Sequence, residues 1–313
     1  MPRPSLRRHL PPSLLLSTSV AVLVAAALVS VRAEAQPAQG LPLGDPHALV
    51  WNDRWPRFST FDYAATAVIG GAAAALYAGG EPAREANWDG PILFDKPIRD
   101  ALRVQSAGAL TDVRMVGDIF TITPVVYVFA DSLFTPLVRN RPDVAWQLSM
   151  MNLQAHAVTG LFLYTMFETV GRARPSHREC EAGTSQDPLC KAGTFASFPS
   201  GHTGGAFTAA GLTCAHHLHL PLYGGGAPDT IACISAITLA SGSGLFRLIG
   251  DRHYATDVLV GGTVGFLVSY GIPSLFHYRE RPLGEIVRTA HVRAAITIGA
   301  ESSPAGASVL GTF

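Results

Sequence analysis

Apolar residues gather into six long stretches, which cover about 63–77, 116–138, 146–170, 204–218, 230–249 and 257–270. Ala, Leu, Val and Gly dominate them, and none shows the strict alternation that is typical of a half-buried strand. Residues 94–103 add a shorter amphipathic pattern. The pattern predicts an all-α protein, a bundle of about six core helices.

The two ends of the chain have different patterns. Three arginines in the first eight residues, an apolar run over 14–29 and the small residues Ala33 and Ala35 are typical of a secretory signal over 1–35. An uncleaved signal anchor is the alternative. Residues 36–56 are rich in Pro, Gly and polar side chains, which predicts a linker.

The helical domain is therefore expected over 57–280, followed by a C-terminal tail over 281–313. In this tail, 291–299 and 307–313 alternate around Pro304, which predicts a short β-hairpin-like ornament.

Composition narrows the class of protein. Hydrophobic residues make up 48% and charged residues 15%, and the formal net charge is zero, so nothing indicates a nucleic-acid partner. The apolar stretches indicate membrane association, but Asp118 and Asp131 interrupt the second one. An exported soluble bundle and a membrane bundle whose site faces the periplasm both stay open. The sequence indicates no oligomeric state.

Three short polar motifs stand at the ends of apolar stretches. Arg172-Ala-Arg174-Pro follows the third stretch, Pro199-Ser-Gly-His202 precedes the fourth, and Arg247-x5-His253-x3-Asp257 joins the fifth to the sixth. Each alone is ordinary: a solvated helix end, a turn with a cap, and a surface ion pair. Together, and in this order, they predict one site at one end of the bundle.

The residue types suit phosphoryl transfer. On a helix, Asp257 would lie on the same face as His253 and could fix its tautomer for nucleophilic attack. The helix start at Ser200 and Gly201 offers backbone N–H groups to an oxyanion. His202 could then protonate a leaving alkoxide.

At this point the chain resembles the type 2 phosphatidic acid phosphatase and vanadium haloperoxidase superfamily. Its pattern is K-x6-R-P, P-S-G-H and S-R-x5-H-x3-D, over roughly 60–278 of this chain. The resemblance implies that His253 is a nucleophile forming a phosphohistidine, Asp257 its orienting partner and His202 the general acid. It also implies phosphate binding by four residues: Arg174, Arg247, Ser200 and Gly201.

Two positions depart from that pattern, because Phe167 replaces the lysine and Phe246 replaces the serine. The lost ammonium removes one phosphate contact. Arg172, Arg178 or Lys191 could substitute for it, and Arg172 is expected first because it lies about one helical turn beyond Phe167.

Four cysteines complete the candidate chemistry. Cys180 and Cys190 bracket the loop between the first two motifs, and export would allow a disulfide there. Cys214 and Cys233 lie in apolar stretches and are expected to be buried small side chains.

The leading hypothesis is a metal-independent, cofactor-free phosphatase that cleaves phosphate monoesters or pyrophosphates. A phosphorylated lipid is the favoured substrate, and a small phosphate ester is the other. The alternatives are a vanadate-dependent haloperoxidase, which alone would need vanadate, and a non-catalytic relative that binds phosphate or lipid. The site is expected to be periplasmic or otherwise extracytoplasmic.

Overall fold

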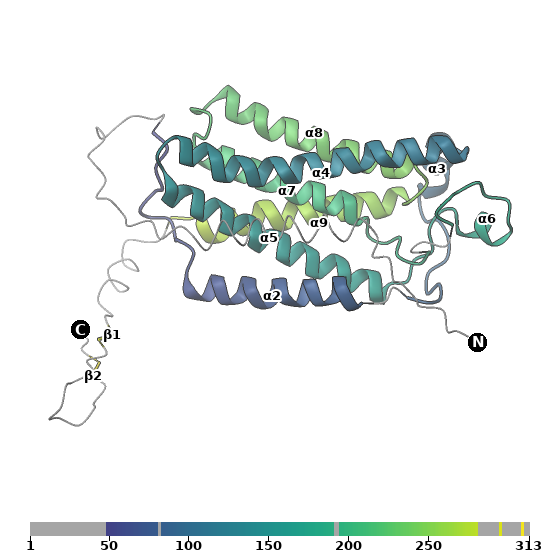
Figure 1. Cartoon of the computed structure of the whole chain (residues 1–313), viewed down its shortest axis with the longest axis horizontal. Coiled ribbons are helices and arrows are strands. Elements are labelled where there is room, and N and C mark those ends of the chain that lie inside the picture. The colour runs from purple at the N-terminus through teal and green to yellow at the C-terminus, as the bar shows by residue number, and fades with distance from the viewer. Residues whose placement is uncertain (1–47, 81–82, 191–193, 281–293, 296–307, 310–313) are drawn as a thin grey trace, which may run out of the picture. The chain divides into compact units, whose positions relative to one another are not determined.

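A computed structural model describes residues 48–80, 83–190, 194–280, 294–295 and 308–309. Six long helices carry the fold: α2 (Thr60–Gly79), α4 (Ala107–Val138), α5 (Pro142–Thr169), α7 (Gly201–His219), α8 (Ala227–Ile249) and α9 (Ala255–Ile272) (Figure 1). Two short helices come between long helices in the sequence: α3 (Asp95–Leu102) follows α2, and α6 (His177–Glu181) follows α5. A π-helical turn (Pro273–His277) extends α9. The prediction of an all-α bundle is confirmed.

Helix α7 lies at the centre and packs against α4, α5, α8 and α9. Small residues allow α7 and α9 to approach each other closely. A Cβ atom on Gly265 of α9 would lie 2.3 Å from the carbonyl oxygen of Gly204, and one on Gly211 would lie 2.1 Å from Ser269 Oγ. The backbones of α7 and α9 thus touch, so α9 is held firmly against the helix that starts at the Pro-Ser-Gly-His motif.

The outer faces of four helices are apolar. By length and composition, α2, α4, α8 and the segment Ala255–His277 could each cross a membrane. They expose large apolar side chains to the outside, among them Val68, Val126, Ile231 and Leu267. Soluble monomers rarely expose large apolar surfaces, so this surface favours the membrane bundle over the exported soluble bundle.

Asp118 and Asp131, which interrupt the apolar pattern of α4, are both paired. His217 lies between two carboxylates, with Nδ1 2.6 Å from Asp229 and Nε2 3.0 Å from Asp131. Asp118 pairs with Arg247. Such pairing explains how the charges that interrupt the apolar pattern are tolerated inside the bundle.

The structure contains two disulfides. Cys180–Cys190 forms as predicted, with the Cα atoms 5.4 Å apart. Of the other two cysteines, Cys214 is buried as expected, but the sequence did not predict that it forms a disulfide with Cys233. Helices α7 and α8 pack so closely that the two Cα atoms are 4.4 Å apart, within the range that a disulfide needs.

The end of the predicted linker lies against the bundle. Leu49 and Trp51 are buried, and the Trp51 ring lies 5.8 Å from that of Tyr278. In the tail, Ala294–Ala295 pairs antiparallel with Ser308–Val309. The predicted signal, most of the linker and the rest of the hairpin lie outside the described residues.

Candidate active site

The three motifs meet where α5 and α8 end and where α7 and α9 begin. Backbone hydrogen bonds join them: Ser200 N–H donates to Asp257 O at 2.9 Å, and Ser197 N–H donates to Arg172 O at 3.1 Å. The Arg174 guanidinium donates to the carbonyl of Arg252 at 2.6 Å. Segments up to 85 residues apart in the sequence thus build one rigid end of the bundle.

His253 lies in the loop between α8 and α9 and is buried. Its Nδ1 lies 2.7 Å from the carbonyl oxygen of Ser197, and because a carbonyl only accepts, Nδ1 carries the proton. The lone pair is therefore on Nε2, which lies 3.4 Å from Arg174 Nη1. Burial, and then the Arg174 guanidinium, hold the pKa of His253 well below its usual value. The ring is a neutral imidazole that turns its lone pair toward a cation.

Asp257 does not orient His253 by a direct hydrogen bond, which corrects the sequence-based prediction. Its nearest carboxylate oxygen lies 3.9 Å from His253 Nδ1. His253 precedes α9, whereas Asp257 is in its first turn, where it accepts from Tyr254 N–H at 2.8 Å. It also accepts from Ser197 Oγ at 2.7 Å. Asp257 thus holds Ser197, and the Ser197 carbonyl holds His253.

Ser197 lies at the candidate site although it belongs to none of the three predicted motifs. It stands two positions before Pro199, and no residue pattern distinguishes it from other loop serines. Its role comes from its two hydrogen bonds, one made by the hydroxyl and one by the carbonyl.

Arg172 is not the substitute cation that was predicted. It is fully buried and ion-paired with Asp257 and, at 2.7 Å, with Asp95. Its Cζ lies 3.9 Å from the ring centroid of Trp88 and 4.4 Å from that of Tyr254. The side chain is enclosed beneath the site, because two carboxylates and two aromatic rings hold it there.

Arg178 and Lys191 were the other candidates to replace the missing lysine. Arg178 is exposed and pairs with Asp89 at 2.8 Å on the surface. Lys191 lies outside the described residues. At the position of the expected lysine, the Phe167 ring lies against the helix start, where a Cβ atom on Gly201 would be 2.8 Å from Phe167 Cζ.

The start of α7 offers an oxyanion site. The first main-chain bond of this helix is donated by Gly204 to Ser200 O at 2.9 Å, so the N–H groups of Gly201, His202 and Thr203 have no acceptor within the helix. The Ser200 hydroxyl is buried and bonded to Thr203 Oγ1 at 2.8 Å. Ser200 therefore shapes the turn, while the following backbone can bind an anion.

Asp118 of α4 joins two of the predicted site residues. Its carboxylate accepts from Arg247 and lies 3.4 Å from His202 Nε2. Arg247 is buried, whereas the His202 side chain is 48% exposed. The Asp118 carboxylate is therefore paired with Arg247, which was expected to bind phosphate. It also lies next to His202, the expected general acid. Asp118 was considered only as an interruption of an apolar stretch.

Further arginines add positive charge at this end of the bundle. Burial lowers the pKa of Arg252 to about 10, and the nearby Arg114 and Arg247 contribute to the shift. Burial also lowers the pKa of Arg174 well below its usual value, and Arg252 adds to this. Arg252, which directly precedes His253, was not predicted and brings a further cation to the site.

The described residues contain no group of three or more His, Cys, Asp or Glu side chains arranged to hold a metal ion. The cationic groups of the site are arginines.

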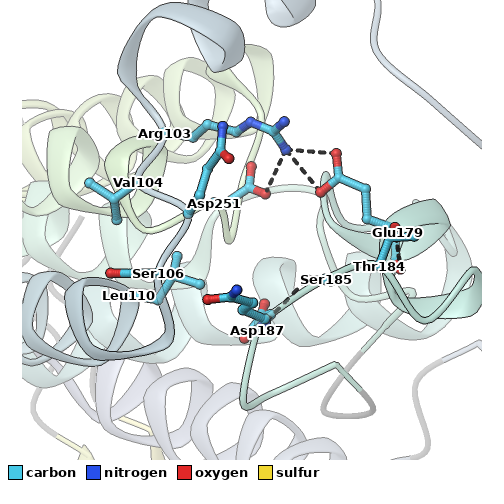
Figure 2. A pocket seen from close by; sticks show the side chains of 11 residues that line it. Arg103, Val104, Ser106, Leu110, Glu179, Thr184, Ser185, Asp187 and Asp251 are labelled. Carbon is cyan, nitrogen blue, oxygen red and sulfur yellow. Dashed lines mark hydrogen bonds and ion pairs between the residues drawn. The ribbon is translucent and has the colours of Figure 1, made fainter.

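A polar cavity of about 520 Å³ lies beside the loop that carries His253. In Figure 2, Arg103 reaches across it to Glu179, at 2.7 Å, and to Asp251. None of the motif residues lines it, although Asp251 belongs to the same loop. The cavity lies at the rim of this end of the bundle and does not include His253.

Comparison with known proteins finds one matching family and several relatives. Residues 144–281 match the family model of the PAP2 superfamily. A lipid A 1-phosphatase of Porphyromonas gingivalis is 44% identical over 72 residues, which are 23% of this chain and 14% of that protein. A probable diacylglycerol pyrophosphate phosphatase of Schizosaccharomyces pombe is 27% identical over 166 residues, 45% of this chain and 59% of that protein.

The chain thus spans less than two thirds of either curated relative. A transmembrane PAP2-type phosphatidylglycerolphosphate phosphatase from Bacillus subtilis has a crystal structure with 18% identity and a TM-score of 0.39. That match covers 83% of this chain and 94% of the other.

Proposed function

We propose that this protein is a metal-independent phosphatase that hydrolyses lipid-linked phosphate monoesters or pyrophosphates. The observation that carries the proposal is the placement of His253. Its protonated nitrogen bonds the Ser197 carbonyl at 2.7 Å, and its free lone pair lies 3.4 Å from the Arg174 guanidinium. A phosphate held by Arg174 would therefore lie next to a neutral imidazole nitrogen.

Hydrolysis would run in two steps. His253 Nε2 attacks phosphorus and forms an N–P bond, while the P–O bond to the leaving group breaks and His202 protonates the departing oxygen. Water then attacks phosphorus, His202 takes its proton, and the N–P bond breaks to release phosphate. Arg174, Arg247 and the N–H groups at the start of α7 would stabilise the equatorial oxygens.

Two features favour a lipid-linked substrate. The relatives in Porphyromonas gingivalis and Schizosaccharomyces pombe carry names that refer to lipid phosphates. The helices around the site also expose apolar side chains, so the pocket would open close to lipid. Neither relative is named as a haloperoxidase.

We propose that the catalytic end faces an oxidising compartment, outside the cytoplasm. The Cys180–Cys190 disulfide lies in the loop between α5 and α7 at this end, and disulfides persist in such compartments. A membrane-impermeant thiol reagent should label these cysteines in intact cells after reduction. Labelling only in broken cells would place the site on the cytoplasmic side.

The test is phosphate release by the purified full chain from a panel of substrates. The panel contains phosphatidic acid, phosphatidylglycerophosphate, diacylglycerol pyrophosphate, lipid A, a polyprenyl pyrophosphate and an aryl phosphate. The His253→Ala variant should lose about 10³-fold or more of the activity, and EDTA should have no effect.

Mass spectrometry at alkaline pH should detect a phosphate on His253 during turnover. Activity that persists in His253→Ala to within about tenfold, or that EDTA abolishes and magnesium restores, would reject the mechanism. Release from no substrate would favour the non-catalytic alternative.

A further inference from the structure

A surface groove runs along α8 and α9, with one side chain of α7, Phe207, in its floor. Its volume is about 510 Å³, which is within the usual range for ligand sites. None of its eleven lining residues, all of them described, carries a charge. The only side-chain hydroxyls are those of Ser241 and Thr263, so the groove is suited to hydrocarbon.

Small residues open the groove. A Cβ atom on Gly262 would meet the Phe207 ring at 3.0 Å, and one on Gly244 would meet Val258 Cγ1 at 2.8 Å. Larger side chains at these two positions would therefore fill the floor. The rim is apolar and open, with Leu259 55% and Leu267 64% exposed.

The groove leads to the candidate active site. Leu248 directly follows Arg247 on α8, and Val258 directly follows Asp257 on α9, and both line the groove. On its inner side, a Cβ atom on Gly244 would be 3.3 Å from Thr203, the neighbour of His202. From Leu248 to Ser241 and from Val258 to Leu267, the groove extends roughly 10–14 Å away from the site, at about 1.5 Å per residue.

An amphipathic ligand would match this arrangement. The cationic groups of Arg174 and Arg247 lie at the end of the bundle, and an uncharged apolar channel continues from them between two helices that could each span a membrane. A ligand with an anionic head and a hydrocarbon tail would satisfy both parts at once. A soluble phosphate ester would leave the groove empty.

We infer that the groove between α8 and α9 holds a hydrocarbon chain of the lipid-linked phosphate while the phosphate lies at His253. This inference rests on the proposed function and adds the location of the tail. It makes Ser241, Leu245 and Thr263 determinants of chain length, although they take no part in the chemistry.

The test uses Ser241→Trp and Thr263→Trp, because both positions are exposed at the rim and tolerate a larger side chain without repacking of the core. Ser235→Trp is the matched control, since Ser235 is an exposed serine on the same helix that does not line the groove. Each variant is assayed with dioleoyl phosphatidic acid and with p-nitrophenyl phosphate. The aryl phosphate reports an intact catalytic centre.

In the two groove variants, kcat/KM for the long-chain lipid should fall about tenfold or more. That corresponds to about 1.4 kcal/mol, or roughly two buried methylene groups. Activity on the aryl phosphate, and both activities of Ser235→Trp, should stay within about twofold of wild type. Equal losses on both substrates, or no loss on either, would overturn the inference. If the wild-type protein self-associates and the groove variants lose this association without any loss of lipid hydrolysis, the groove belongs to a contact with a second copy of the chain.

A second measurement does not depend on turnover. A phosphatidic acid with a photoreactive group at the end of one acyl chain is irradiated with the protein in nanodiscs. The label should map to 241–248 or 258–267, and Ser241→Trp should reduce it. Labelling confined to α2 and α4 would overturn the inference. If wild type cleaves nothing but this label appears, the proposed function fails and the lipid site stands.

Discussion

Arg172 offers the sharpest test, because sequence and structure assign it different roles. In the structure it neutralises Asp95 and Asp257 in a fully buried cluster. Arg172→Gln leaves both carboxylates without a counter-charge, and breaking a buried ion pair costs about 3–5 kcal/mol. At about 2–4 °C per kcal/mol for a domain of this size, the unfolding temperature should fall by about 6–20 °C.

The substitution should also affect His253, the proposed nucleophile. Asp257 holds Ser197 by its hydroxyl at 2.7 Å, and Ser197 holds His253 Nδ1 at 2.7 Å. A displaced Asp257 would loosen the His253 ring, so kcat should fall more than the inhibition constant for vanadate rises. Adding Asp95→Asn should recover part of the stability, because one of the two unpaired carboxylates is removed.

Arg178→Gln is the matched control. Arg178 belongs to the same segment, but its ion pair with Asp89 is at the surface. Its loss should leave the unfolding temperature nearly unchanged, because exposed pairs contribute little. The assays are thermal unfolding in detergent, phosphate release and vanadate inhibition. An Arg172→Gln variant that unfolds like wild type but binds vanadate much more weakly would refute this argument and make Arg172 a phosphate ligand.

Three further predictions concern the pocket itself. Because the pKa of His253 is held well below 6.5, its ring stays neutral as pH falls through the usual histidine range. The acid limb of kcat/KM should therefore have its midpoint below pH 6.5, and a midpoint above it would contradict the placement of His253. His202→Ala should reduce the hydrolysis of alkyl phosphates by about 10²-fold or more, and that of aryl phosphates less, because a good leaving group needs little protonation. Equal losses would mean that His202 binds rather than protonates. Asp118→Asn should strengthen vanadate inhibition up to about tenfold, because it frees Arg247 from a competing carboxylate, whereas Asp112→Asn on the exposed part of α4 should have no effect. Unchanged inhibition would show that Asp118 does not compete with the oxyanion.

The helices and the position of the candidate site could be predicted from the sequence. The six apolar stretches predicted the six long helices, because a helix depends on local composition and on residues a few positions apart. The three polar motifs could be placed at one end of the bundle for the same reason, since each stands next to a helix terminus. The Cys180–Cys190 disulfide could also be predicted, because its two cysteines are close in the sequence.

Only the tertiary structure decided which groups each polar residue contacts. Arg172 pairs with Asp95, 77 residues away, and not with the phosphate side of the pocket. His253 donates to a backbone carbonyl, and no side-chain pattern reports where a carbonyl points. Cys214 and Cys233 join because α7 and α8 pack closely. A sequence motif specifies the kinds of groups in a site, but a buried charge or ring nitrogen takes its partner from whatever the packing of distant helices places within reach.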